Sequence, residues 1–308
     1  MSEVKHPSVG IVGVGNMGGG MAAHLLAQGW SVHIFDLDAV KANNFEQNGA
    51  ITHANSAQVA INCEALIVCV VDAVQTESVL FGPESCLAQL TDRHTVLLCP
   101  TLAPEDVERF AAHLEAHGVS TIDAPMSGGP ARARDGSMSL MRAAPDAVIA
   151  ANQTLLQALS SKRFHVSQRP GDAARTKLVN NLLAGINLVG AAEALAMAQR
   201  MGLDLGTTLD VIEQSSGQSW IGTDRMRRVL ANGGLGDYAP RAHMTLLQKD
   251  TRLAVEAGQA AGFTGPLGAS TAAVFAQASA AGLAGEDDAA VFKLLNKQPM
   301  GHPSTILI

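Results

Sequence analysis

The segment that most constrains the fold of this chain is a glycine-rich turn near its N-terminus, Gly13-Val14-Gly15-Asn16-Met17-Gly18. A short apolar run, residues 9–12, precedes the turn, and a helix-like run, residues 21–28, follows it. The next apolar run ends at Asp36, which lies 23 residues past Gly13. A strand, a G-x-G-x-x-G turn, a helix and an acid at this distance together predict a Rossmann-type unit that binds a dinucleotide.

The physical role of each part indicates which dinucleotide the unit binds. Glycines let the backbone turn tightly and approach a pyrophosphate, whose charge is stabilised by the N-terminus of the following helix. The acid accepts hydrogen bonds from the adenosine ribose and repels the 2′-phosphate of NADP, and the next residues, Leu37-Asp38, offer no arginine to hold that phosphate. We therefore predict NAD as the cofactor, against the alternative of a glycine turn without a ligand. The residues predicted to contact it here are Gly13, Gly15, Asn16, Met17, Gly18 and Asp36.

Strand-like and helix-like segments alternate as far as about residue 168 and then give way to helices alone. The further predicted strands are residues 65–71, 95–99, 119–123, 138–142 and 164–166. The later predicted helices are residues 205–214, 225–230, 244–261, 268–280 and 287–295. A chain of 308 residues is long enough for two domains. The sequence therefore predicts an α/β fold: a doubly wound NAD-binding domain, residues 1–168, and an all-helical substrate and oligomerisation domain, residues 169–308.

One long helix is predicted to join the two domains, from Asp172 as its N-cap to Gly202 as its C-cap. Its alanine content and the spacing of its larger apolar residues predict burial on most sides. Lys177 and Asn181 lie one turn apart in this helix and share a face. A lysine in such surroundings is either paired in a structural ion pair or functional, and the helix alone leaves both possibilities open.

Two smaller motifs allow both a functional and a structural interpretation. The loop Ser127-Gly128-Gly129 follows a predicted strand and could hold a carboxylate with its backbone N–H groups and one hydroxyl, or it could be a plain turn. His113 and His117 have the i, i+4 spacing of metal ligands, but no third ligand is evident. A solvated helix face is the favoured interpretation of the histidines, and no metal is predicted.

Composition narrows the class of protein further. The formal net charge of −7 gives no positive surface for nucleic acid or for an anionic membrane. The four cysteines lack C-x-x-C spacing and are predicted to be free thiols. We find no signal-peptide pattern and expect a cytoplasmic protein. The helical half is rich in alanine and glycine, and its apolar helices outnumber what one small core could cover, which favours self-association.

The order of four motifs resembles that of the β-hydroxyacid dehydrogenase family, which includes 3-hydroxyisobutyrate dehydrogenase and tartronate semialdehyde reductase. The motifs are Gly13-Val14-Gly15-Asn16-Met17-Gly18, Asp123-Ala124-Pro125-Met126-Ser127-Gly128-Gly129, Gly171 with Lys177 and Asn181, and Lys249-Asp250. Further segments, among them Ser219-Trp220 and Arg225-Met226-Arg227, resemble the bacterial L-threonate dehydrogenase branch. Asp72 departs from that branch, where asparagine is expected.

The resemblance implies a homodimer or homotetramer, and it implies roles for particular residues. Lys177 would be the catalytic acid and base, and Asn181 would hold the reacting hydroxyl or carboxylate. The substrate carboxylate would lie at Ser127, Gly128 and Gly129, and Arg225 would add a polar contact to the substrate. The residues implied at the nicotinamide end of the cofactor are Thr101, Lys249 and the backbone of Val71 and Asp72.

The implied activity is NAD-dependent oxidation of a small hydroxy acid, with L-threonate as the leading substrate. The alternatives within the family are a tartronate semialdehyde reductase and a 3-hydroxyisobutyrate dehydrogenase. A dinucleotide-binding scaffold without activity, and an imine reductase, are the alternatives of other classes. The presence of both Lys177 and Asn181 argues against the scaffold, and the imine reductase branch resembles this fold with the lysine replaced.

Overall fold

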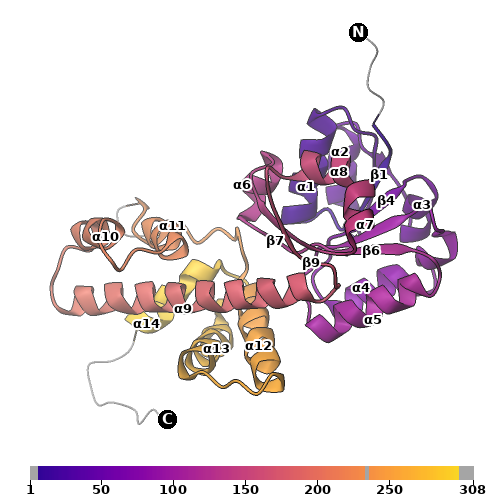
Figure 1. Cartoon of the computed structure of the whole chain (residues 1–308). Helices are drawn as coiled ribbons and strands as arrows, with labels where there is room; N and C mark the ends of the chain where they lie inside the picture. The colour runs from indigo at the N-terminus through magenta and orange to yellow at the C-terminus, as the bar shows by residue number, and fades with distance from the viewer. Residues whose placement is uncertain (1–5, 233–235, 298–308) are drawn as a thin grey trace. The chain divides into compact units, whose positions relative to one another are not determined.

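The computed structural model describes residues 6–232 and 236–297 (Figure 1). It divides into two compact units, Met1–Lys177 and Leu178–Ile308, each described here by itself. The division falls inside the long helix α9 (Asp172–Arg200), which begins in the first unit and continues into the second. The domain boundary predicted near residue 168 lies just before this helix.

The first unit is built on one sheet with the strand order β3-β2-β1-β4-β5-β6-β8-β7, and β9 pairs with β8. Strands β1 to β6 are parallel, whereas β8 runs antiparallel to β6 and β7. The order 3-2-1-4-5-6 of the parallel strands is that of a Rossmann fold, so the predicted fold class is confirmed. The strands are β1 (Val9–Val12), β2 (Val32–Phe35), β3 (Ile51–Thr52), β4 (Ala65–Val68), β5 (Thr95–Leu98), β6 (Ser120–Asp123), β7 (Met126–Ser127), β8 (Ser139–Ala143) and β9 (Lys162–Ser167).

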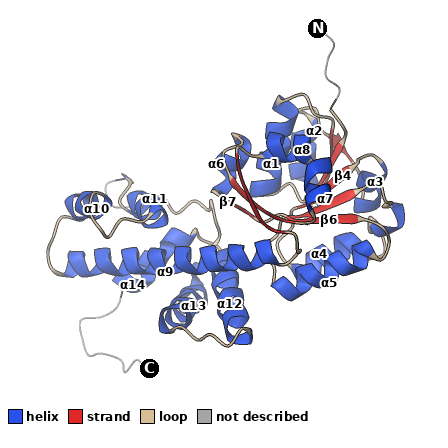
Figure 2. Ribbon diagram, viewed as in Figure 1, coloured by secondary structure: helices blue, strands red, loops and turns tan. Residues whose placement is uncertain are grey.

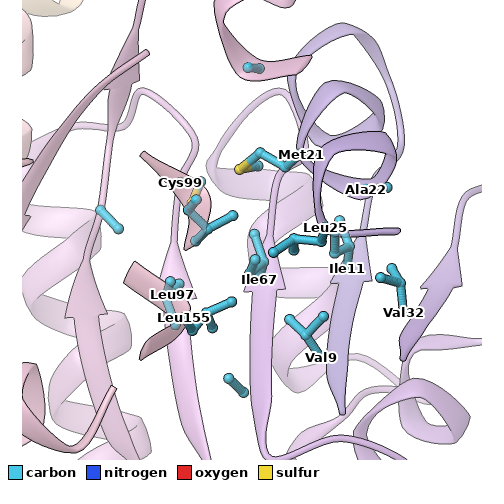
Figure 3. Close-up of a cluster of buried hydrophobic side chains, with 14 of the residues drawn as sticks. Val9, Ile11, Met21, Ala22, Leu25, Val32, Ile67, Leu97, Cys99 and Leu155 are labelled. Atoms are coloured by element: carbon cyan, nitrogen blue, oxygen red, sulfur yellow. The ribbon is translucent and has the colours of Figure 1, made fainter. Parts of the chain in front are cut away.

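Helices cover both faces of this sheet (Figure 2) because its central strands are apolar on both sides. On one face Ile11, Ile67 and Leu97 pack with Met21 and Leu25 of α1 (Figure 3). Residues that alternate with them in the strands pack on the other face against α3, α4 and α5. The helices of this unit are α1 (Asn16–Ala27), α2 (Ala39–Glu46), α3 (Ser56–Ile61), α4 (Ala73–Phe81), α5 (Pro104–Glu115), α6 (Gly129–Arg134), α7 (Asp146–Ala151) and α8 (Gln153–Leu159).

Helix α1 begins five residues earlier than its apolar pattern predicted, at Asn16 instead of Met21. The early part contains three consecutive glycines, which give no periodic signal but allow close packing. A Cβ on Gly18 would lie 1.9 Å from the carbonyl oxygen of Gly13, and one on Gly20 would lie 2.8 Å from Cβ of Ala133 in α6. Gly18 and Gly20 are therefore required by the close approach of the preceding turn and of α6 to the start of α1.

Helix α9 ends as predicted and begins differently. Gly202 has φ +75°, and the N–H of Leu203 bonds to the carbonyl of Ala198, which is the hydrogen bonding of a Schellman C-cap. The prediction that Asp172 is the N-cap was wrong. Asp172 is already inside the first turn, and the backbone N–H groups of Gly171, just before the helix, and of Ala174, in its first turn, bond to the carboxylate of Asp123.

The burial predicted for α9 was too extensive. Val179, Leu183 and Met197 are 71%, 58% and 61% exposed, so one side of the helix is apolar but uncovered. By length and composition alone α9 could cross a membrane, although 44% of its apolar 18-residue stretch is buried within the protein. The core helix of a soluble protein passes the same test, so this feature is weak evidence for a membrane span.

The described residues of the second unit form helices and the loops between them, as predicted for the C-terminal domain. Leu188 and Leu195 of α9 pack against Met226, Met244 and Phe275 to form its core. Boundaries differ from the predictions by a few residues, most at α11, which begins at Trp220 directly after its N-cap Ser219. The helices are α10 (Leu205–Glu213), α11 (Trp220–Val229), α12 (Met244–Ala260), α13 (Pro266–Ala278) and α14 (Val291–Asn296).

Candidate active site

The glycine-rich turn has the backbone shape that a dinucleotide pyrophosphate requires. Gly13 has φ +91°, and a Cβ there would lie 2.6 Å from the carbonyl oxygen of Cys69. A Cβ on Gly15 would meet no heavy atom within 4 Å, so the backbone is open at that position. Gly15 is also the N-cap of α1 and supplies no side-chain acceptor to the first turn of the helix. The turn therefore presents an uncovered helix N-terminus at which a phosphate can bind.

Asp36, the acid at the end of β2, lies directly beside this turn. Its Oδ2 accepts a hydrogen bond of 2.8 Å from the backbone N–H of Val14, and its Oδ1 accepts one of 2.8 Å from Asp38. The structure thus brings together the turn and the acid that the sequence paired by spacing. The two bonds fix the carboxylate in place before any ribose arrives.

Replacing Asp36 is expected to weaken the discrimination between the two nicotinamide cofactors. Asp36→Ala removes the acceptor for the ribose hydroxyls and the charge that repels a 2′-phosphate. We expect the wild type to prefer NAD by a large factor in kcat/KM and the variant to narrow the gap by at least about tenfold. Steady-state kinetics with NAD and NADP measures both. Equal use of the two cofactors by the wild type would contradict this role.

The other residues predicted to contact cofactor follow parallel strands at the same edge of the sheet. Val12, Val68, Leu98 and Asp123 are in register across β1, β4, β5 and β6, so the segments after these strands meet at one edge. The predicted residues in these segments are Val71, Asp72 and Thr101.

Asp72 has a local structural role that explains why an acid can stand where the family branch has asparagine. Its carboxylate is the N-cap of α4 and accepts a hydrogen bond of 2.9 Å from the backbone N–H of Gln75. Aspartate and asparagine cap helices about equally well. The N–H of Val71 is bonded to the side chain of Gln75 at 3.0 Å, so the backbone contact with cofactor predicted at Val71 stays a prediction.

The loop Ser127-Gly128-Gly129 joins β7 to α6. Gly128 and Gly129 have φ of +132° and +77°, a conformation that residues with a Cβ rarely adopt. A Cβ on Gly128 would lie 2.8 Å from Cδ of Arg132, so an arginine stem packs against the loop. Arg132 was not among the residues predicted for the site. The sequence feature that could have indicated Arg132 is its position, a cation in the helix that directly follows the loop. A carboxylate bound at the loop would lie close to this cation.

Lys177 and Asn181 lie on α9 as predicted, at i and i+4 of one continuous helix. Lys177 is 7% exposed and Asn181 is 8% exposed. Asn181 donates a hydrogen bond of 2.6 Å from Nδ2 to Oδ2 of Asp250 in α12. The structure therefore places both residues on the predicted helix face and gives the asparagine a fixed partner.

Asp250 is a further candidate site residue. It belongs to the Lys249-Asp250 motif, but only Lys249 had a predicted role. Nζ of Lys249 lies 3.0 Å from Oδ1 of Asp250, while Oδ2 of the same carboxylate accepts from Asn181. One buried acid thus links two residues that were predicted to contact cofactor and substrate. It orients the amide of Asn181 and balances the charge of Lys249.

Arg225 is bound by protein carboxylates. Its Nε and Nη2 donate to the two oxygens of Asp288 at 2.5 and 3.2 Å, and Nη1 donates to Asp224. The side chains of Arg225 and Asp288 are 12% and 3% exposed. These contacts describe a structural ion pair in the helical unit. They give no support to the prediction that Arg225 binds substrate.

The remaining titratable residues considered as ligands show structural roles. His113 and His117 are exposed on and just after α5, where the ring of His113 stacks on Phe81 at 4.2 Å between centroids. Among the described residues no group of three or more histidine, cysteine, aspartate or glutamate side chains could hold a metal ion. All four cysteines are free, as predicted, and burial raises the pKa of Cys69 to about 12.

Together, the sheet order, the glycine turn and the acid beside it define a dinucleotide-binding protein of the Rossmann class. Comparison with known families agrees. Residues 8–167 match the family described as the NAD binding domain of 6-phosphogluconate dehydrogenase, and residues 171–295 match the family described as NAD-binding of NADP-dependent 3-hydroxyisobutyrate dehydrogenase. The chain belongs to the β-hydroxyacid dehydrogenase family and is an NAD-dependent oxidoreductase.

Individual relatives are similar over nearly the whole chain. L-threonate dehydrogenase of Cupriavidus necator is 34% identical over 93% of this chain and 95% of its own length. 3-Hydroxyisobutyrate dehydrogenase of Pseudomonas aeruginosa is 33% identical over 85% of this chain and 88% of its own. A solved structure of a 3-hydroxyisobutyrate dehydrogenase from Salmonella typhimurium is 33% identical, covers 94% of this chain and 100% of its own, and superposes with a TM-score of 0.86.

Proposed function

We propose that this protein oxidises L-threonate to 2-oxo-tetronate with NAD. The observation that carries the proposal is the full-length similarity to L-threonate dehydrogenases of several bacteria, at 34% identity for the one from Cupriavidus necator. The glycine turn and Asp36 support the cofactor, and the pair Lys177 and Asn181 supports the dehydrogenase chemistry. A 3-hydroxyisobutyrate dehydrogenase is the second candidate, because relatives of that name are almost as similar.

The proposed chemistry assigns one task to each residue. Bound NAD supplies the acceptor for the hydride that leaves the substrate carbon. The neutral amine of Lys177 takes the proton of the substrate hydroxyl in oxidation, and its ammonium form returns the proton in reduction. Asn181, oriented by Asp250, holds the reacting hydroxyl or carboxylate in place. The backbone N–H groups and hydroxyl of the Ser127-Gly128-Gly129 loop bind the substrate carboxylate, with the charge of Arg132 beside them.

A substrate screen tests the proposal. The purified enzyme is assayed with three- to six-carbon hydroxy acids, each with NAD and with NADP, by absorbance of the reduced nicotinamide. We expect the highest kcat/KM with L-threonate and NAD, with 3-hydroxyisobutyrate lower by at least about tenfold. A higher kcat/KM for 3-hydroxyisobutyrate, or for tartronate semialdehyde with NADH, would replace the proposed substrate by that one.

We further propose that the enzyme is a cytoplasmic homodimer or homotetramer. The apolar side chains exposed on α9, Val179, Leu183 and Met197, support self-association because water-exposed apolar surface of this kind is usually covered in an oligomer. The negative net charge fits a protein without nucleic-acid or membrane partners.

A further inference from the structure

Asp123, the last residue of β6, is a buried acid to which the proposed reaction gives no role. Its side chain is 1% exposed. Oδ2 accepts hydrogen bonds from the backbone N–H groups of Gly171 at 2.8 Å and of Ala174 at 3.0 Å. Oδ1 makes no hydrogen bond within the described residues. Because both donors belong to the start of α9, a carboxylate of the sheet caps this helix from 48 residues away.

The start of α9 has no cap of its own that could replace Asp123. Gly171 occupies the position before the helix and has no side chain to accept from the first turn. Its φ is +99°, and an added Cβ would lie 2.9 to 3.0 Å from the side chains of Glu108 and Arg175. The carboxylate of Asp172 bonds to other side chains instead. The first turn of α9 therefore depends on Asp123.

The strand that ends at Asp123 also leads into the proposed substrate loop. Ser127 follows four residues later, and Lys177 follows one turn after the bonded amide of Ala174. Ala173, between the two bonded amides, is fully buried against Met141 and Ala143 of β8. Strand, loop and helix start are thus joined at one carboxylate within the first unit.

We propose that Asp123 is a positioning residue for Lys177: it fixes the first turn of α9 to the end of β6 and so sets the place of the amine relative to the Ser127-Gly128-Gly129 loop. The inference rests on the proposed role of Lys177. A displaced amine slows proton transfer, because an acid or base must be within about 2.6–3.2 Å of the proton that it moves. NAD binding is proposed to depend on the glycine turn and on Asp36, which follow β1 and β2 and not β6.

The two oxygens of Asp123 suggest a matched pair of variants. Asp123→Asn can keep a carbonyl oxygen where Oδ2 accepts both bonds and place its amide where Oδ1 has no partner, whereas Asp123→Ala removes the acceptor. Burial raises the pKa of Asp123 to about 6, although hydrogen bonds from Ala174, Gly171 and Ala173 oppose the shift. In an assay near pH 8 the wild-type group is charged, so the asparagine variant changes charge while it keeps the cap.

The test compares kcat with the KM for NAD in these variants. We expect Asp123→Ala to lose at least about tenfold in kcat, since a displacement of about 1 Å can cost about a hundredfold, and to keep its KM for NAD within about twofold. Asp123→Asn is expected to stay within about threefold of the wild-type kcat. The control is Asp204→Ala, which removes an acid that caps α10 with a bond of 2.7 Å to Thr207. It should lower the melting temperature and leave kcat within about twofold.

Several outcomes overturn the inference. A wild-type kcat in Asp123→Ala would overturn it. A loss of NAD binding in Asp123→Ala as severe as its loss of kcat would also overturn it. If Asp123→Ala does not fold, Gly171→Ala tests the same contact, because it strains the helix start and leaves the acid in place. We expect the same loss of kcat with NAD binding retained, and wild-type turnover in this variant overturns the inference. Lys177→Ala separates the two proposals: if it is active the proposed chemistry fails, and if it is inactive while Asp123→Ala is active only the positioning role fails.

Discussion

Lys177→Ala is expected to bind NAD with near wild-type affinity, to melt within a few degrees of the wild type and to lose at least about a hundredfold in kcat. Proton transfer by a positioned side chain contributes about 10²–10⁴-fold to a rate, so its removal falls mainly on kcat. A lysine that served only as a structural partner would behave in the opposite way. Its removal would leave a buried acid unpaired and cost several kcal/mol of stability.

Two further variants sharpen this experiment. Lys177→Arg should not restore turnover, because a guanidinium stays protonated and cannot accept the proton of an alcohol. Lys162→Ala, which removes an exposed lysine of β9, is the control and should be active. If Lys177→Ala keeps a tenth of the wild-type kcat, or does not fold, the lysine is structural.

Arg225→Ala is expected to destabilise the helical unit by about 3–5 kcal/mol, because it leaves the buried carboxylate of Asp288 without its cation. Nε of Arg225 lies 2.5 Å from Oδ1 of Asp288, and a second buried arginine, Arg228, lies 2.9 Å from the neighbouring acid, Asp287. In a protein of this size the loss corresponds to a fall of about 10 °C in melting temperature, measurable by thermal and urea unfolding.

Arg227→Ala is the matched control for this prediction. Arg227 lies on the same helix and pairs with Asp210 and Glu213, but its side chain is 46% exposed. Exposed pairs contribute about 0–1 kcal/mol, so this variant should melt close to the wild type. A well-folded Arg225→Ala enzyme with wild-type stability and a raised KM for the hydroxy acid would instead establish the substrate role implied by family resemblance.

The parts of the fold that could be predicted from the sequence are those with local signals. The glycine turn and Asp36 were assigned to one site because the spacing of a Rossmann unit fixes both, and the structure places them side by side. Gly202 predicted the end of α9, because a C-cap requires only one residue with positive φ. The start of α1 was not predicted correctly, because its first turns lack such a local signal: Gly18, Gly19 and Gly20 carry no apolar periodicity.

The contacts that hold the buried polar side chains in place could not be predicted, because they join residues far apart in the chain. Asn181 and Asp250 are 69 residues apart, Arg225 and Asp288 are 63 apart, and Asp123 and Gly171 are 48 apart. Each is a pairing between elements whose relative placement only the folded chain provides. A single sequence shows that these side chains are polar in apolar surroundings, which predicts that they have partners but not which partners.

The two hydrogen bonds that Asp36 accepts from Val14 and Asp38 have a consequence for engineering the cofactor preference. The carboxylate predicted to select the ribose is also the acceptor for a backbone amide of the turn predicted to bind the pyrophosphate. A redesign towards NADP therefore cannot treat position 36 as an isolated selectivity determinant. It needs a new acceptor for the N–H of Val14 together with a cation for the 2′-phosphate, and a substitution that supplies only the cation loosens the turn on which either cofactor depends.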